Sequence, residues 1–138
     1  DWLDQDGFPF WSLWDNARTW WAIRDLPNVH MVHFANLKSD MPGEIRRIAE
    51  FIGTSIEESK WDKILKHCSF DYMKANATKS VPLGGAFWEG GAETFIHKGT
   101  NGRWRDVLSA EQTMNYEQRA ESELGPDCAH WFATGELK

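Results

Sequence analysis

The sequence has little of several features that would narrow its class. It has only two cysteines, Cys68 and Cys128, which lie far apart, and neither belongs to a C-x-x-C pair. This usage favours reduced thiols in a cytoplasm over a disulfide scaffold. No apolar run approaches the length that spans a membrane, and no signal peptide is recognisable. We therefore expect a cytoplasmic protein without a membrane span.

Positive charge is also scarce. The chain has fifteen Lys and Arg residues and twenty-one Asp and Glu residues, so its formal net charge is −6. No global cationic field exists to hold a polyanion, which argues against a general nucleic-acid binder. The spacing of the five histidines suggests no metal site, and we expect none. The 138 residues are 41% hydrophobic, which is enough for one domain with a real core.

Tryptophan, in contrast, is abundant. The chain has nine, and five of them lie within Trp2–Trp21. So much aromatic surface must be buried against something. One alternative is therefore a non-catalytic helical interaction module that uses the tryptophan-rich surface to bind a partner.

Apolar periodicity and capping residues predict a mostly helical chain. Ser55 and Ser109 each open a capping-box pattern. Asp40 or Ser39 is placed to cap the helix that begins at Asp40 and ends before Gly53. Asp1–Pro9 and Ala77–Thr94 are predicted to be irregular. The expected helical segments are Phe10–Arg24, Asp40 to Ile52, Ser55 to Cys68, Ser69–Lys74, Ser109 to Leu124 and Cys128–Ala133.

The one predicted strand is Val29–Phe34. Its two faces are both mostly apolar, as in a buried parallel strand. His30 and His33 fall on opposite faces, which favours structural roles for them over a metal pair. One strand cannot form a sheet, so the chain is either a helical domain with an odd strand or part of an α/β domain with further strands upstream. The apolar faces favour the α/β fold class.

The stretch Thr94–Arg105 carries the clearest chemical pattern. Gly99 and Gly102 flank a Thr-Asn pair, Lys98 precedes them, and Arg103 follows. Glycines let backbone N–H groups approach a ligand closely, and cations beside them suit an anion such as phosphate. An ordinary basic surface turn explains the loop alone about equally well.

Several segments, in order, resemble the carboxy-terminal half of a cytosolic-type sulfotransferase that uses 3'-phosphoadenosine 5'-phosphosulfate (PAPS). The last segment is the most diagnostic of the family. Three matching segments in the right order are stronger evidence for the family than any one segment alone. The matching segments are Trp20-Trp21, Phe34–Lys38, Pro42–Gly53, His67–Asn76 and Phe95–Arg105.

The resemblance implies a P-loop-NTPase-like three-layer α/β fold. Residues 1–138 would be the mostly helical carboxy-terminal part of a single domain, with at least one buried parallel strand. It also implies that this chain holds the adenine and the 3'-phosphate of PAPS, or of its product adenosine 3',5'-bisphosphate (PAP). The implied residues are Phe34, Cys68, Ser69, Phe70, Met73, Phe95, Ile96, His97, Lys98 and Gly99.

The chain departs from the family pattern at three positions. His97 replaces an arginine, Phe34 stands where tyrosine is common, and Met114 replaces the glutamate of a dimer motif that otherwise matches Arg105 and Ser109. The last change weakens the prediction of a homodimer through that motif. Without the resemblance, Phe34, Phe70 and Met73 would be assigned to an ordinary core.

The resemblance implies sulfuryl transfer from PAPS to a hydroxyl or amine acceptor, either a small molecule or a glycolipid, without a metal. The family's 5'-phosphosulfate loop and catalytic base lie upstream of the matched segments. We therefore assign no catalytic residue in this chain and do not expect it to catalyse alone. The interaction module, and a nucleotide-binding relative without transfer chemistry, stay open as alternatives.

Overall fold

The computed structural model describes residues 5–6 and 10–137. In this part of the chain there is no β-strand, and no helix is long and apolar enough to cross a membrane. The α-helices are α1 (Leu13–Ala22), α2 (Phe34–Ser39), α3 (Met41–Phe51), α4 (Glu58–Cys68), α5 (Phe70–Ala75), α6 (Ala77–Ser80), α7 (Gly91–Phe95), α8 (Ala110–Leu124) and α9 (Pro126–Thr134). Two short 3-10 helices are η2 (Pro82–Gly85) and η3 (Arg103–Asp106).

The chain divides into two compact units, each with its own buried residues. Unit 1 comprises Asp1–Glu44 and Arg103–Lys138, and unit 2 comprises Ile45–Gly102. The first predicted loop, Asp1–Pro9, falls mostly outside the described residues, as does Trp2.

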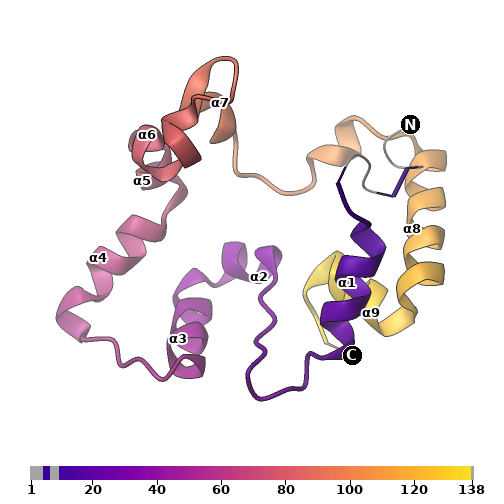
Figure 1. Cartoon of the computed structure of the whole chain (residues 1–138), viewed down its shortest axis with the longest axis horizontal. Coiled ribbons are helices and arrows are strands. Elements are labelled where there is room, and N and C mark those ends of the chain that lie inside the picture. The colour runs from indigo at the N-terminus through magenta and orange to yellow at the C-terminus, as the bar shows by residue number, and fades with distance from the viewer. Residues whose placement is uncertain (1–4, 7–9, 138) are drawn as a thin grey trace. The chain divides into compact units, whose positions relative to one another are not determined.

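In unit 1, α1, α8 and α9 pack together (Figure 1). Trp14 of α1 is buried, and its ring lies 5.5 Å from that of Tyr116 on α8. Trp21 contacts Trp131 of α9 with 5.6 Å between ring centroids. The predicted helix at the start of the chain is thus confirmed with shorter bounds, and part of the tryptophan surface is buried within the chain itself.

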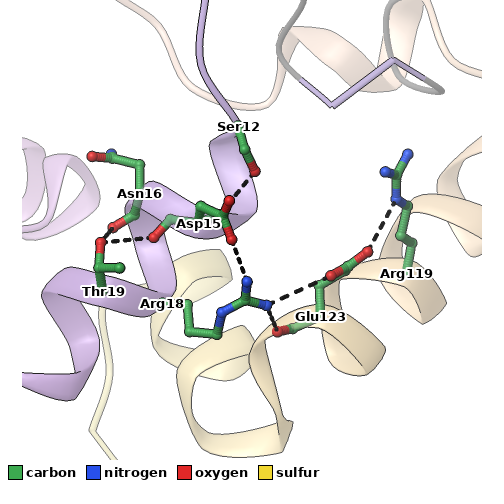
Figure 2. Close-up of polar contacts among 7 residues, drawn as sticks. All are labelled: Ser12, Asp15, Asn16, Arg18, Thr19, Arg119 and Glu123. Carbon is green, nitrogen blue, oxygen red and sulfur yellow. Dashed lines mark hydrogen bonds and ion pairs between the residues drawn. The ribbon is translucent and has the colours of Figure 1, made fainter.

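Polar contacts join α1 to α8 (Figure 2). Arg18 pairs with Asp15 on its own helix and donates to the main-chain carbonyl of Glu123 over 3.2 Å. The Glu123 carboxylate also faces Arg18 at 3.7 Å and Arg119 at 3.9 Å. These charges are substantially exposed, so the pairs orient the helices and contribute little stability.

His33 and Asn36 tie α2 to the end of α9. The Nδ1 atom of His33 accepts from the N–H of Ala35 at 3.2 Å, so Nε2 carries the proton and donates to the Phe132 carbonyl at 3.1 Å. Asn36 donates to the Gly135 carbonyl at 3.0 Å. The structural role predicted for His33 is confirmed.

Burial also raises the pKa of two groups of unit 1. It raises the pKa of the Tyr116 phenol above its ordinary value. It likewise raises the pKa of the Cys128 thiol, an effect that the positive charge of Arg24 partly offsets. In both cases the low-dielectric interior disfavours the anion.

Unit 2 has a small core of Ala77, Val81 and Ala92, against which Trp88 and Ile96 pack. These residues come from α6, α7 and the segment between them. The prediction that Ala77–Thr94 is irregular is therefore wrong in part. Its helices are only four or five residues long, which is too short to show helical periodicity in the sequence.

The predicted strand is wrong. Val29–His33 has no regular structure in the described chain, and its side chains are only partly buried. The Val29 N–H donates to the Leu26 carbonyl in a turn, and Phe34 already begins α2. Apolar faces indicate burial, but a strand also needs a neighbour with which to exchange main-chain hydrogen bonds. The described residues offer none.

The helix caps were predicted with mixed success. Asp40 accepts from the N–H of Gly43 at 3.0 Å at the start of α3, as expected. The capping box at Ser109 is confirmed in full. The one at Ser55 is wrong, because α4 begins only at Glu58, whose carboxylate pairs with Arg46 at 3.1 Å instead of reaching back to Ser55.

Candidate functional site

The predicted phosphate loop follows α7 directly. Ile96 ends that helix, and residues 97–100 have no regular structure. Gly99 has φ = +58°, in the left-handed region that glycine adopts without steric penalty. A Cβ at this position would lie 2.4 Å from Cδ2 of Phe70. The loop backbone therefore rests directly on the Phe70 ring, and only glycine fits there.

Phe70 is held in place by the start of α5. Its neighbour Ser69 is the N-cap, with a hydroxyl that accepts from the N–H of Tyr72 at 3.2 Å and donates to the Lys66 carbonyl at 2.8 Å. This cap fixes the point at which the Phe70 side chain leaves the helix. Phe70 remains only partly buried, so part of its ring faces solvent.

Lys74, one turn further along α5, connects the two segments and was missed as a site residue. Its Nζ donates to the main-chain carbonyl of His97 at 3.3 Å. The same ammonium lies 5.9 Å from the centroid of the Phe70 ring. It sits four residues after Phe70, a spacing that places both on one face of a helix and was the available signal.

The predicted cations differ in their surroundings. Lys98 is exposed, and its ammonium has no hydrogen bond or ion pair within the described part of the chain. The His97 side chain is exposed as well. In unit 1, Arg105 lies over the ring of Trp104, with 4.4 Å between Cζ and the ring centroid. Lys98, next to Gly99, is therefore open to receive an anion.

Of the apolar residues predicted beside the loop, one packs on the core of unit 2 and the others are exposed. Ile96 packs on the core of unit 2. Phe95 is 50% exposed, and its ring lies 4.5 Å from that of Trp88. Met73 and Cys68 are also exposed, so the assignment of Met73 to an ordinary core does not hold.

Phe34 is the one predicted site residue that belongs to unit 1. It begins α2 in unit 1 and is 56% exposed, which again does not fit a core residue. The packing within unit 2 brings together Phe70, Gly99 and the main chain of His97, and it does not include Phe34.

Comparison with known proteins points to one family. Residues 3–126 match the Sulfotransferase domain family. Human Sulfotransferase 1C2 is 27% identical over 115 residues, which make up 82% of this chain and 39% of the relative. Rat Sulfotransferase 2A6 is 27% identical over 118 residues, 86% of this chain and 42% of the relative. The Glycolipid sulfotransferase of Mycobacterium bovis is 26% identical over 118 residues, 85% and 36% of the two chains.

Solved structures agree. Mouse sulfotransferase SULT7A1 complexed with PAP matches 97% of this chain and 49% of its own, with a TM-score of 0.78 and 22% identity. Retinol dehydratase in complex with androsterone and inactive cofactor PAP matches 80% of this chain and 33% of its own, with a TM-score of 0.66 and 28% identity. The chain spans 39–42% of the length of the human and rat curated relatives. The protein belongs to the Sulfotransferase domain family.

Proposed function

We propose that the chain forms the adenine and 3'-phosphate side of a donor site for PAPS, within a sulfotransferase that transfers a sulfuryl group to a hydroxyl or amine acceptor. The observation that carries the proposal is the contact of the Gly99 backbone with the Phe70 ring, next in sequence to Lys98, whose ammonium has no partner among the described residues. Membership of the family and the PAP in the two solved structures support the choice of nucleotide.

In this proposal Lys98 and the loop backbone bind the 3'-phosphate. Lys98 supplies a charge that forms no ion pair with residues 5–6 or 10–137, and Gly99 allows a phosphate oxygen to come close to main-chain N–H groups. His97 supplies a smaller share, because an imidazole is only partly charged near neutral pH. Lys74 holds the His97 carbonyl and thereby positions the loop.

The adenine would lie against the exposed part of the Phe70 ring. Stacking of a base on an aromatic ring contributes roughly 1–3 kcal/mol. Ser69 has its proton committed to the Lys66 carbonyl, so its hydroxyl could offer adenine only an acceptor. Cys68, Met73, Phe95 and Ile96 would complete the apolar surroundings, and the role of Phe34 of α2 rests on the family resemblance alone.

The reaction would break the bond between sulfur and the bridging oxygen of PAPS and form one between sulfur and the acceptor oxygen or nitrogen. PAP leaves, and a base takes the acceptor's proton. Positioning and charge stabilisation dominate such transfers. The residues of this chain would position the nucleotide. We assign none of them as the base, and we do not identify the acceptor.

Calorimetric titration with PAP and with 5'-AMP tests the donor site. Because 5'-AMP lacks the 3'-phosphate, the wild-type chain should bind PAP more tightly, and Lys98→Ala should reduce that preference. Lys79→Ala removes an exposed lysine of the same unit outside the loop and serves as the matched control. Equal affinity of the wild-type chain for both nucleotides, or an equal loss in both variants, would overturn the proposal.

A further inference from the structure

Unit 1 contains a cavity that the donor site does not use. It has a volume of about 640 Å³ and lies between α8 and α9, with Trp104 of η3 and Leu13 of α1 also on its wall. Ligand pockets typically measure roughly 300–1,000 Å³. The cavity is therefore large enough for a small organic molecule.

The cavity wall is mainly apolar and includes three aromatic rings. Trp104, Tyr116 and Phe132 contribute them, and alanines of α8 and α9 supply much of the rest. Tyr116 also packs on the buried Trp14, so this wall is anchored in the interior of the unit. Such a surface binds the hydrocarbon body of a ligand and can also hold a cation against a ring face.

Two carboxylates lie on the cavity wall. Glu117 and Glu121, one turn apart on α8, both line it, and neither has an ion pair within the described residues. His130 also lines the cavity, and its Nε2 lies 3.8 Å from the Glu136 carboxylate. The guanidinium of Arg105 lies over the Trp104 ring, with 4.4 Å between Cζ and the ring centroid. Two exposed carboxylates at an apolar cavity complement a positively charged head group.

We propose that this cavity binds a small organic amine, with the apolar body among the three aromatic rings and the ammonium group between Glu117 and Glu121. The site shares no residue with the proposed donor site. The proposal concerns binding and does not assign sulfuryl transfer to the bound amine.

Three probes with the same hydrocarbon body separate charge from apolar burial. They are 4-phenylbutylamine, 4-phenylbutanol and 5-phenylpentanoate, titrated into the 138-residue chain by calorimetry. Exposed ion pairs contribute about 0.2–1 kcal/mol each. The amine should therefore bind about fivefold more tightly than the alcohol, and the carboxylate most weakly.

Variants locate the site. The double variant Glu117→Gln with Glu121→Gln should remove the preference for the amine while leaving the alcohol unchanged, and Glu111→Gln, an exposed change elsewhere on α8, should have no effect. Ala133→Phe should fill the cavity and weaken the amine and the alcohol alike, by about tenfold. Its helicity and unfolding midpoint are measured alongside.

Absence of amine binding would overturn the proposal, as would equal affinity for amine and alcohol. A preference that survives the double Gln variant would equally contradict it. These outcomes depend only on exposed glutamates, so they stay decisive even where Ala133→Phe fails to fold.

Discussion

Replacing Gly99 by alanine should disrupt the contact between the loop and Phe70. Two penalties follow from the structure. A non-glycine residue in the left-handed region costs about 1–2 kcal/mol, and the backbone at Gly99 has φ = +58°. The added Cβ would also lie 2.4 Å from Cδ2 and 2.6 Å from Cε2 of the Phe70 ring, so the ring or the loop must move. Overpacking of this kind costs roughly 1–3 kcal/mol.

Gly53→Ala isolates the first penalty. Gly53 lies in the same unit with φ = +68°, and a Cβ there would meet nothing within 4 Å. Gly53→Ala should therefore lower the free energy of unfolding by about 1–2 kcal/mol, and Gly99→Ala by a further 1–3 kcal/mol or so. Urea unfolding, followed by NMR on signals from unit 2, measures both. PAP affinity should fall about tenfold or more in Gly99→Ala, since 1.4 kcal/mol is a factor of ten.

A double-mutant cycle with Phe70→Ala tests the physical cause. Removing the ring removes the collision, so Gly99→Ala should cost about as much as Gly53→Ala in that background. The reasoning is refuted if Gly99→Ala destabilises the wild-type chain no more than Gly53→Ala does, or if its penalty is the same with and without the ring.

Further predictions concern the two cysteines, Tyr116 and the cap of α8. Iodoacetamide should alkylate the exposed Cys68 in the folded chain and reach Cys128, which is 2% exposed, only after unfolding, so mass spectrometry should find one adduct under native conditions. Burial raises the pKa of Tyr116 and of Cys128, so the unfolded chain releases these protons first as the pH rises. Stability should be full at neutral pH, begin to fall near the ordinary pKa of each group, and continue to fall up to its raised pKa in the folded chain. Tyr116→Phe should reduce the drop in urea stability between pH 7 and pH 10, and an equal drop in both proteins would contradict this. Ser109→Ala should lower the free energy of unfolding by about 1 kcal/mol through loss of the capping box with Gln112, whereas an unchanged urea midpoint would speak against the cap.

Local chemistry predicted the longer helices well. The capping box at Ser109 and the Gly125-Pro126 break bound α8 as expected, because both signals act within a few residues. The strand at Val29 was wrong, since pairing depends on residues far away in sequence. The short α2 escaped notice because its cap is His33, a residue that a sequence pattern does not associate with capping.

In the candidate site, too, local features could be predicted from the sequence and long-range contacts could not. Gly99 and Lys98 could be identified from the loop sequence, because glycine and lysine have specific roles in binding anions. The contact of Gly99 with Phe70 and the bond from Lys74 to the His97 carbonyl join segments more than twenty residues apart, so no local pattern reveals them. The roles of all ten proposed nucleotide contacts, and the assignment of the chain to a single domain, stay predictions.

The most direct test of the donor site is an NMR titration of the 138-residue chain with PAP, compared with 5'-AMP. The account predicts that PAP shifts the amide signals of Lys98 and Gly99 and the ring signals of Phe70, and that 5'-AMP shifts those of Phe70 with much smaller changes in the loop. Absence of shifts in the loop with PAP, or shifts confined to unit 1, would contradict it.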